Sequence, residues 1–372
     1  WRATMKFNCQ CQKIRQEIEY ARNFSTQKNS LSISSNVLLE NSGDTLVITT
    51  TDGKMTFVST IEVSTIIPGS TTVFCDKLME VLKNMPEGEL EFSDDDGRLT
   101  IRPTGDDSNI NINLKTMDAS KYPEIKNCPD DLFFSLTQKE FIEMIDKTAF
   151  AVSEDTTRFF LTGVYMEKKE DRIAMVATDG RRLAFISKAF EQEIPSFTPV
   201  ILPVKFLQQF KSISTGEGVF SIAINGDTVF IKLANRVISS LLIGGNYPNY
   251  ERVIPKNLQY SCKMKVSDME MALSLNAVLI ETNSRRIFID LNQEGVMVSG
   301  ENNEFGDSKQ IIQCEYNGPS AKISFNCQLL LPTIKKFESE FFKISYTSPT
   351  AAMVFSPEPD DDYLFVMMPM QS

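Results

Sequence analysis

The stretch VATDGRRLAFISK, residues 176–188, has the pattern of two strands joined by a tight turn. Val176, Leu183 and Phe185 are apolar residues of its two arms, and Asp179-Gly180 lies at the reversal. Asp-Gly is typical of a hairpin turn, because glycine readily adopts the positive φ that sharp reversals require. Two arginines, Arg181 and Arg182, follow the turn at once, so this hairpin is predicted to place positive charge beside a sheet.

The hairpin belongs to a block of helix, strand and hairpin that recurs three times. Its amphipathic helices are expected at residues 10–24, 137–152 and 267–280. The apolar residues expected to face inward on these helices are Ile14, Ile18 and Ala21, then Phe141, Ile142, Ile145 and Ala149, then Met271, Leu275 and Val278. A second block, a helix followed by a hairpin, comes after each first block, at residues 75–103, 202–233 and 326–355.

Two related segments, residues 117–127 and 244–257, close the first and second thirds of the chain, and both contain Tyr-Pro. We therefore expect three similar domains, at residues 5–130, 131–257 and 258–372. Each should be an α+β domain with two helices packed on antiparallel sheets of about eight strands. Met5 has the character of a natural start, so residues 1–4 are expected to be an artificial extension, and Trp1 is set aside.

Composition excludes several classes of function. The 372 residues contain no histidine, which removes the commonest general base and metal ligand. Seven scattered cysteines form no C-x-x-C pair, which favours a reducing cytoplasm over zinc or disulfide frameworks; we expect no cofactor and no metal. No apolar run approaches the length of a membrane span. The net charge of −11 argues against a generally DNA-adhesive surface, although 38 basic residues can gather on one face.

Three motifs in fixed order, TDGRRLA at 178–184, YPNYERVIP at 247–255 and MPM at 368–370, resemble the beta sliding clamp, the processivity subunit of bacterial DNA polymerase III. The resemblance runs over residues 5–372. It implies a head-to-tail homodimeric ring that encircles duplex DNA independently of sequence and tethers the replicative polymerase, a clamp loader and repair proteins, without catalysis. Twelve helices, each about 10 Å wide, would line a hole of roughly 28 Å, which admits a duplex of roughly 20 Å.

Basic residues on the polar faces of the expected helices are the candidates for this lining, while the same pattern also suits ordinary solvated faces. The resemblance favours the lining, adds a basic loop residue, Lys28, and matches Phe159 and Phe160 to an aromatic pair that contacts DNA. The DNA-facing set is Lys13, Arg15, Arg22, Lys28, Lys77, Lys83, Lys139, Lys147, Phe159, Phe160, Lys205, Lys211, Lys335 and Lys336.

The resemblance also implies a pocket for a short extended peptide with a glutamine and a Leu/Phe anchor pair. The matching positions are Leu161, Thr178, Gly180, Arg181, Arg182, Leu183, Pro248, Arg252, Val253, Val366, Met368, Pro369 and Met370. Methionine adapts to varied side chains, and Arg182 and Arg252 are expected to hold partner carbonyls or carboxylates. Ser284, Leu329 and the Gln371-Ser372 end depart from the family pattern, which predicts a shifted partner preference.

The subunit contact implied by the resemblance joins Ile112 and Leu114, on an edge strand of the first domain, to Val278 and Leu279 on a helix of the third. Two rival interpretations stay open at this point. One is an enzyme that uses carboxylates such as Asp179 with Asp155. The other is a repeat scaffold that binds proteins but no DNA, in which the helix-face lysines point away from any opening.

Overall fold

The computed structural model describes residues 5–26, 32–105, 109–281 and 283–371, so Lys28 lies outside the described residues. Two compact units make up the chain. The first contains residues 1–139 and 205–242, and the second contains residues 140–204 and 243–372. No helix in the described ranges is both long and apolar enough to cross a membrane.

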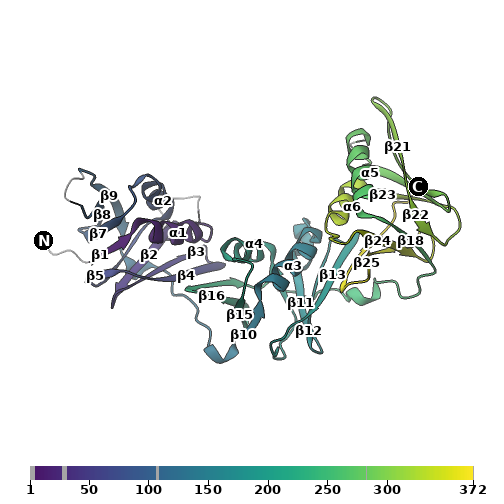
Figure 1. The fold of residues 1–372 in the computed structure, drawn as a ribbon. Coiled ribbons are helices and arrows are strands. Elements are labelled where there is room, and N and C mark those ends of the chain that lie inside the picture. The colour runs from purple at the N-terminus through teal and green to yellow at the C-terminus, as the bar shows by residue number, and fades with distance from the viewer. Residues whose placement is uncertain (1–4, 27–31, 106–108, 282, 372) are drawn as a thin grey trace. The chain divides into compact units, whose positions relative to one another are not determined.

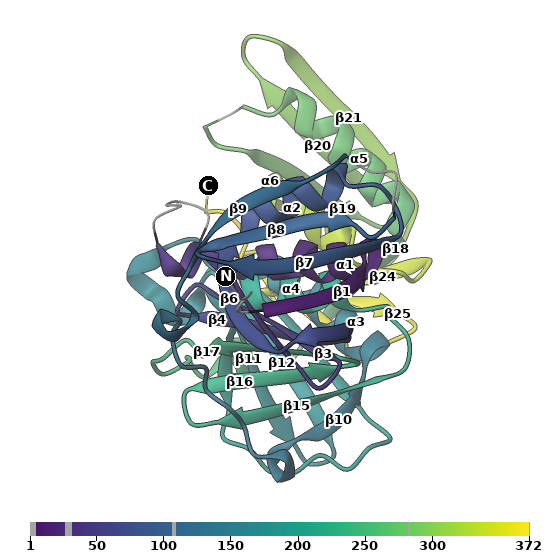
Figure 2. The same ribbon diagram turned by 90° about the vertical axis from the view of Figure 1, so that its left-hand side faces the viewer.

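The first unit is built on one antiparallel sheet of thirteen strands (Figures 1 and 2). Its strands, in sheet order, are β10 (Phe134–Thr137), β15 (Val219–Asn225), β16 (Thr228–Leu233), β17 (Arg236–Leu241), β4 (Met55–Glu62), β3 (Thr45–Thr51), β2 (Asn36–Ser42), β6 (Gly69–Phe74), β9 (Ile112–Met117), β8 (Arg98–Pro103), β7 (Glu89–Asp95), β1 (Met5–Gln10) and β5 (Ser64–Ile67). The expected first and second domains share this sheet, because β17 pairs with β4.

Helices α1 (Cys11–Arg22) and α2 (Cys75–Asn84) pack together in this unit (Figure 1). Ile14, Ile18 and Ala21 are fully buried on α1, which confirms the predicted inward face. The same helix buries one charged side chain, Glu17, whose carboxylate accepts two bonds from the Arg236 guanidinium at 2.8 and 2.6 Å. This ion pair joins a helix of the first expected domain to a strand of the second.

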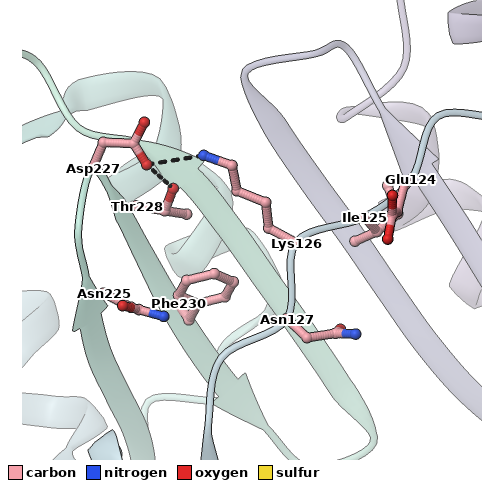
Figure 3. Close-up of a pocket in the computed structure, with 8 residues that line it drawn as sticks. All are labelled: Glu124, Ile125, Lys126, Asn127, Asn225, Asp227, Thr228 and Phe230. Carbon is pink, nitrogen blue, oxygen red and sulfur yellow. Dashed lines mark hydrogen bonds and ion pairs between the residues drawn. The ribbon is translucent and has the colours of Figure 1, made fainter.

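The segment between β9 and β10 crosses the outside of the first unit. Lys126 in this segment lies 3.0 Å from the carboxylate of Asp227, which also accepts a bond from the Thr228 hydroxyl at 2.7 Å (Figure 3). A hollow of about 590 Å³ opens beside this contact, with Glu124 among the residues that line it. The connecting segment therefore contacts the β15–β16 turn through an exposed ion pair.

The second unit has two antiparallel sheets. The nine-stranded sheet consists, in order, of β14 (Val200–Pro203), β11 (Gly163–Lys169), β12 (Arg172–Thr178), β13 (Arg182–Ala189), β26 (Tyr363–Met367), β25 (Met353–Glu358), β24 (Phe341–Tyr346), β18 (Tyr260–Lys265) and β22 (Cys314–Tyr316). The four-stranded sheet consists of β21 (Gly306–Ile312), β20 (Gly295–Asn302), β19 (Arg286–Asn292) and β23 (Ala321–Asn326). Here too a strand pair, β13 with β26, joins two expected domains.

The remaining helices are α3 (Gln138–Thr148), α4 (Val204–Ile213), α5 (Val266–Leu279) and α6 (Cys327–Ile334). Each expected domain thus has two α-helices among the described residues, as predicted from the repeats. Phe141 and Ile145 of α3 and Ala149 just after it are buried, and Ile142 is half-buried, so the predicted inward face of this helix is confirmed.

The prediction for α5 is wrong. Met271, Leu275 and Val278 are 64%, 48% and 79% exposed, and the opposite face is buried instead. Asn276 fixes that choice, because its Nδ2 donates to Gln310 Oε1 at 2.5 Å and its Oδ1 accepts from Ser308 Oγ at 2.6 Å. These bonds hold α5 against the β20–β21 hairpin, which reaches past the helix (Figures 1 and 2).

Candidate functional site

The turn between β12 and β13 has the predicted hairpin geometry. The Asp179 carboxylate accepts bonds from the backbone N–H groups of Arg181 (2.8 Å) and Arg182 (3.0 Å). Gly180 has a φ of +87°, and a Cβ at this position would lie 2.9 Å from Arg158 Nη1. Only glycine suits this backbone and this close approach. The turn is therefore held by the Asp179 bonds and approached on one side by the Arg158 side chain.

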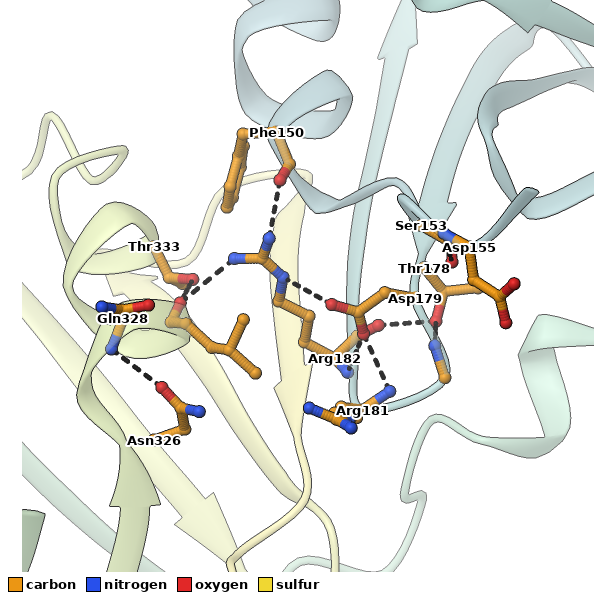
Figure 4. Close-up of polar contacts among 12 residues, drawn as sticks. Phe150, Ser153, Asp155, Thr178, Asp179, Arg181, Arg182, Asn326, Gln328 and Thr333 are labelled. Carbon is orange, nitrogen blue, oxygen red and sulfur yellow. Dashed lines mark hydrogen bonds and ion pairs between the residues drawn. The ribbon is translucent and has the colours of Figure 1, made fainter. Parts of the chain in front are cut away.

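Arg182 is held inside the second unit by three acceptors (Figure 4). Its Nε donates to Asp179 Oδ2 at 3.1 Å, its Nη1 to the Leu329 carbonyl at 3.3 Å, and its Nη2 to the Phe150 carbonyl at 2.7 Å. The side chain is only 10% exposed. Three of the five N–H donors of Arg182 are thus bonded within the protein, and its expected role toward partner carbonyls stays a prediction. Its role is to position the turn against α6.

An apolar cluster lies behind the turn. Leu183 on β13 pairs in register with Val366 on β26, and both are buried together with Val176 and Tyr250. Tyr250 donates its hydroxyl to Glu167 Oε1 at 2.5 Å, and burial raises its pKa, so the phenol stays protonated.

Sequence reasoning missed the tyrosines of this cluster, Tyr165, Tyr247 and Tyr250. The rings of Tyr165 and Tyr247 stack with centroids 4.7 Å apart. The Tyr-Pro pair in both boundary segments could have identified Tyr247. A tyrosine ring has a large apolar area, which favours its burial against the neighbouring domain core.

The other predicted pocket residues differ in exposure. Leu161 and Thr178 are buried, Pro369 and Met370 are half-buried, and Gly180, Arg181, Pro248 and Arg252 are exposed. Val253 and Met368 are about half exposed, at 49% and 47%. The backbone N–H of Met368 donates to the Arg181 carbonyl at 3.1 Å, so the C-terminal segment lies beside the turn. The predicted pocket set therefore includes buried residues, two half-exposed apolar side chains and a C-terminal segment beside the turn, and the pocket itself stays a prediction.

The candidate DNA-facing cations are mostly exposed, and many are paired with carboxylates. Lys83 and Lys139 are exposed and make no ion pair within the described part of the chain. Lys211 and Lys336 are half-buried, and Lys336 Nζ lies 5.7 Å from the ring centroid of Phe150. The paired cations are Lys13 with Glu62, Arg15 with Glu87, Arg22 with Asp76, Lys77 with Glu80, Lys205 with Asp52 and Lys335 with Glu270.

Lys147 does not suit the DNA-facing assignment. Its side chain is 8% exposed and its ammonium lies 2.5 Å from Glu143 Oε1 and 3.9 Å from Asp361 Oδ2. The same ammonium lies over the ring of Tyr363 at 5.4 Å. These contacts place Lys147 at the β26 end of the second unit as an internal ion pair, so we leave it out of the proposed DNA-facing set.

Phe159 and Phe160 form an edge-to-face pair with centroids 5.8 Å apart, and Phe159 is 51% exposed.

Asp155, which precedes this aromatic pair, accepts bonds from Thr157 N and Arg158 Nε. Hydrogen bonds from Thr157 and Arg158 hold the pKa of the Asp155 carboxyl below its usual range. A general base needs a pKa raised toward neutrality, so the turn geometry favours a structural role for this carboxylate over the catalytic rival.

The four residues predicted for the subunit contact lie on partly open surfaces. Ile112 and Leu114 are half-buried on β9. That strand pairs with β8 along its length, but with β6 only through Thr116 and Met117. Val278 is the most exposed large apolar residue of the described chain and Leu279 is half-buried. A strand edge and an apolar helix face are thus both open.

Comparison with known proteins identifies the family. Family models of the DNA polymerase III beta subunit match three consecutive segments: the N-terminal domain at residues 5–126, the central domain at 135–249 and the C-terminal domain at 251–371. The chain belongs to the DNA polymerase III beta subunit family. Its three tandem clamp domains are joined by the two antiparallel strand pairs described above. The pair β4 with β17 joins the first domain to the second, and the pair β13 with β26 joins the second to the third.

Relatives in this beta-subunit family align over the whole chain. The beta sliding clamp of Treponema pallidum is 36% identical, covering 99% of this chain and 100% of the relative. A DnaN sliding clamp of Pseudomonas aeruginosa, solved with griselimycin bound, has a TM-score of 0.93 at 25% identity, over 99% and 100% of the two chains. A clamp of Bacillus subtilis gives a TM-score of 0.94 at 22% identity over the full length of both chains, which shows the shared fold.

Proposed function

We propose that two copies of this chain close head to tail into a ring around duplex DNA and tether the replicative polymerase to it. The full-length match of three clamp-domain models carries this proposal. The role is mechanical and not catalytic, and it belongs in the cytoplasm, where the chromosome is copied. Partners are the duplex itself, the polymerase, a clamp loader and repair proteins.

The proposed subunit contact uses the open edge of β9 and the exposed stripe of α5. An unpaired strand edge readily pairs with another chain, and a head-to-tail contact closes into a ring when its rotation allows. On the other side of the contact, β21 is also an edge strand, and its Ile311 is 74% exposed. Ile112, Leu114, Val278 and Leu279 are therefore proposed as the centre of this contact.

The proposed DNA lining is only weakly positive. Most of its cations already have a carboxylate within 4 Å, so each can offer little net charge to a phosphate. Weak attraction suits a ring, because enclosure prevents escape while few direct contacts allow sliding. The net charge of −11 on the chain would keep DNA away from surfaces outside the ring.

The apolar surface beside the β12–β13 turn is the proposed pocket for the short peptide of the partners. Leu183 and Val366 form its floor, and Val253 and Met368 offer exposed apolar area at its edge. Methionine suits varied anchors because its side chain is unbranched and flexible. The internally bonded Arg182 keeps the turn in place during exchange of partners.

A threading assay tests the ring without a clamp loader. Linear duplex DNA with biotin at both ends is bound to beads at one end, incubated with the protein, and then closed at the free end with streptavidin. We expect the protein to remain through washes at moderate salt only when the free end is closed after incubation. Cleavage of the closed DNA with a restriction enzyme should release it.

Two control reactions separate enclosure from adhesion. If streptavidin is added before the protein, threading is blocked and retention should be lost. Equal retention on DNA with open and closed ends would contradict the proposal, because it would mean that the protein holds DNA by direct contact. If the protein is retained on none of the DNA samples but still binds partner peptides, the scaffold interpretation is favoured.

A further inference from the structure

The C-terminal segment, residues 368–370, separates the proposed peptide pocket from a second hollow. On one side, Met368 N donates to the Arg181 carbonyl at 3.1 Å, beside the turn. On the other side, Met370 N donates to the Ser324 carbonyl at 2.8 Å, and Ser324 Oγ donates to the Met370 carbonyl at 3.0 Å. The segment therefore extends the edge of the four-stranded sheet beyond β23.

The second hollow, which we call the basic hollow, has a volume of about 690 Å³. Residues that line it include Arg286, Phe288, Lys322, Pro349, Pro369 and Met370. Pro369 and Met370 also belong to the proposed peptide pocket, so the two sites are continuous along one short segment. A peptide that lies across this segment has the basic hollow within reach of its next residues.

Among the residues described as lining it, the basic hollow has two cations and no Asp or Glu. Lys322 Nζ lies 4.6 Å from the ring centroid of Phe288, and Arg286 Nη2 donates to the Gln371 carbonyl at 2.9 Å. Neither cation makes an ion pair with any described residue, and this includes Asp290, the cross-strand neighbour of Lys322. The basic hollow thus has two cations without an ion-pair partner among the described residues, in a chain whose net charge is −11.

Arg286 also has an unused donor. Its Nε is buried and finds no hydrogen-bond partner in the described part of the chain. Buried polar atoms are nearly always bonded, so this guanidinium has hydrogen-bonding capacity that the described residues leave unused. A carboxylate is the acceptor that matches a guanidinium in charge and in shape.

Other hollows of this protein are built differently. The hollow beside Lys126 contains Glu124 and Asp227, and its neighbour contains Asp130 with Lys232. The hollow near Lys147 contains four carboxylates. In each of these the cations face acidic groups of the same chain, so only the basic hollow among them has a charge left for a partner.

We propose that the basic hollow binds an acidic side chain of the same partner peptide whose apolar anchors occupy the proposed pocket. This inference rests on the proposed function and adds a rule of selection to it: peptides with Asp or Glu beside the anchor motif bind this clamp better than peptides with neutral flanks. Lys322 and Arg286 supply the attraction, and Phe288 and Pro349 supply apolar contact for the methylene groups of the acidic residue.

The test compares synthetic peptides that carry a glutamine and a Leu-Phe pair. Three versions have neutral Gln flanks, Glu residues on the N-terminal side, or Glu residues on the C-terminal side. Binding to the full chain is measured by isothermal titration calorimetry at low and high salt. We expect one Glu version to bind about fivefold tighter than the neutral version at low salt, and the advantage to shrink at high salt.

Variants locate the effect. Lys322→Gln should remove most of the advantage of the Glu flank and leave binding of the neutral peptide unchanged. Lys309→Gln, which removes the same charge from β21 at the opposite edge of the same sheet, should leave the advantage intact. Lys322 is preferred to Arg286 for the test because Arg286 also holds the Gln371 carbonyl.

Three results would overturn the inference. These are equal affinity of all three peptides, an advantage that survives in Lys322→Gln, and an advantage that Lys309→Gln reduces equally. In each case the neutral peptide would still bind, so the proposed pocket would stand. Failure of all three peptides to bind would instead remove the pocket itself, and the inference with it.

Discussion

At the scale of single residues, two neighbouring arginines have opposite environments. The sequence places Arg181 and Arg182 side by side after one turn, and nothing in their spacing separates them. In the structure Arg181 is exposed, while Arg182 is almost fully buried and bonded to three acceptors. Two of those acceptors, the carbonyls of Phe150 and Leu329, come from segments distant in sequence, so no local pattern could have predicted them.

Replacing Arg182 tests this positioning role. We expect Arg182→Gln to lower the free energy of unfolding by about 2–4 kcal/mol, because it leaves Asp179 without its counter-charge and removes the bonds to the Phe150 and Leu329 carbonyls. Peptide binding should weaken as well, because the turn beside the proposed pocket would lose its contacts with Phe150 and Leu329. Urea denaturation followed by circular dichroism measures the stability, and hydrogen exchange at β13 and β26 locates the loss.

Arg181→Gln is the matched control, and it should change stability by no more than about 0.5 kcal/mol. Arg182→Lys keeps the charge but cannot reproduce the planar fork, so it should recover only part of the loss. A full recovery by lysine would show that charge alone matters here. Similar stability losses for the two glutamine variants would refute the special role of Arg182.

At the scale of elements, helices and strands were predictable where one face is apolar and the other polar. Helix α1 shows this, since its buried face is the one that its periodicity indicates. Helix α5 shows the limit, because apolar residues occupy both of its faces and periodicity cannot choose between them. Which face is buried depends on Asn276 and on Gly300. A Cβ added at Gly300 would lie 2.9 Å from Asn276 Oδ1, so glycine leaves room for this amide. Such a polar contact across elements requires the fold to be known.

A buried ion pair that the sequence also concealed accompanies the pairing of β17 with β4. Glu17 is 4% exposed and accepts bonds from Arg236 and from Ser59 Oγ at 2.7 Å. Arg236 also lies over the ring of Tyr20, at 4.6 Å. Glu17→Gln should destabilise the first unit by about 3 kcal/mol, because a buried guanidinium then lacks its counter-charge. Thermal denaturation followed by circular dichroism measures this change.

A double variant separates the pair from its surroundings. Glu17→Gln combined with Arg236→Met removes both charges and keeps an unbranched apolar side chain on β17. We expect this variant to be more stable than Glu17→Gln alone, since no unpaired charge remains buried. If the two single losses simply add, then the carboxylate and the guanidinium act independently, and the junction is held by the strand pairing itself.

At the scale of the whole molecule, the sequence predicted three repeated domains with two helices each, and the family models and the described helices agree with this. What the repeats could not predict is which surfaces are left open. Three exposed apolar residues on one face of α5 were predicted to lie inside, because a single chain is normally expected to bury such a stripe. In the sequence, an apolar helix stripe that contacts a second copy of the chain has the same spacing as a stripe that packs on the core of its own domain.

Breaking this stripe therefore tests the assembly. Val278→Asp places a charge at a position that is 79% exposed in the single chain, so the fold of the second unit should be unchanged. If a second copy covers Val278, the buried and unpaired carboxylate should weaken dimerisation by about 2 kcal/mol or more. Sedimentation equilibrium should then show a monomer at concentrations where the parent chain is a dimer, and retention on end-closed DNA should be lost. Gln293→Asp, which adds the same charge in the exposed turn between β19 and β20, should leave both properties intact. A dimer of undiminished affinity in Val278→Asp would place the subunit contact elsewhere and leave the apolar stripe for a different partner.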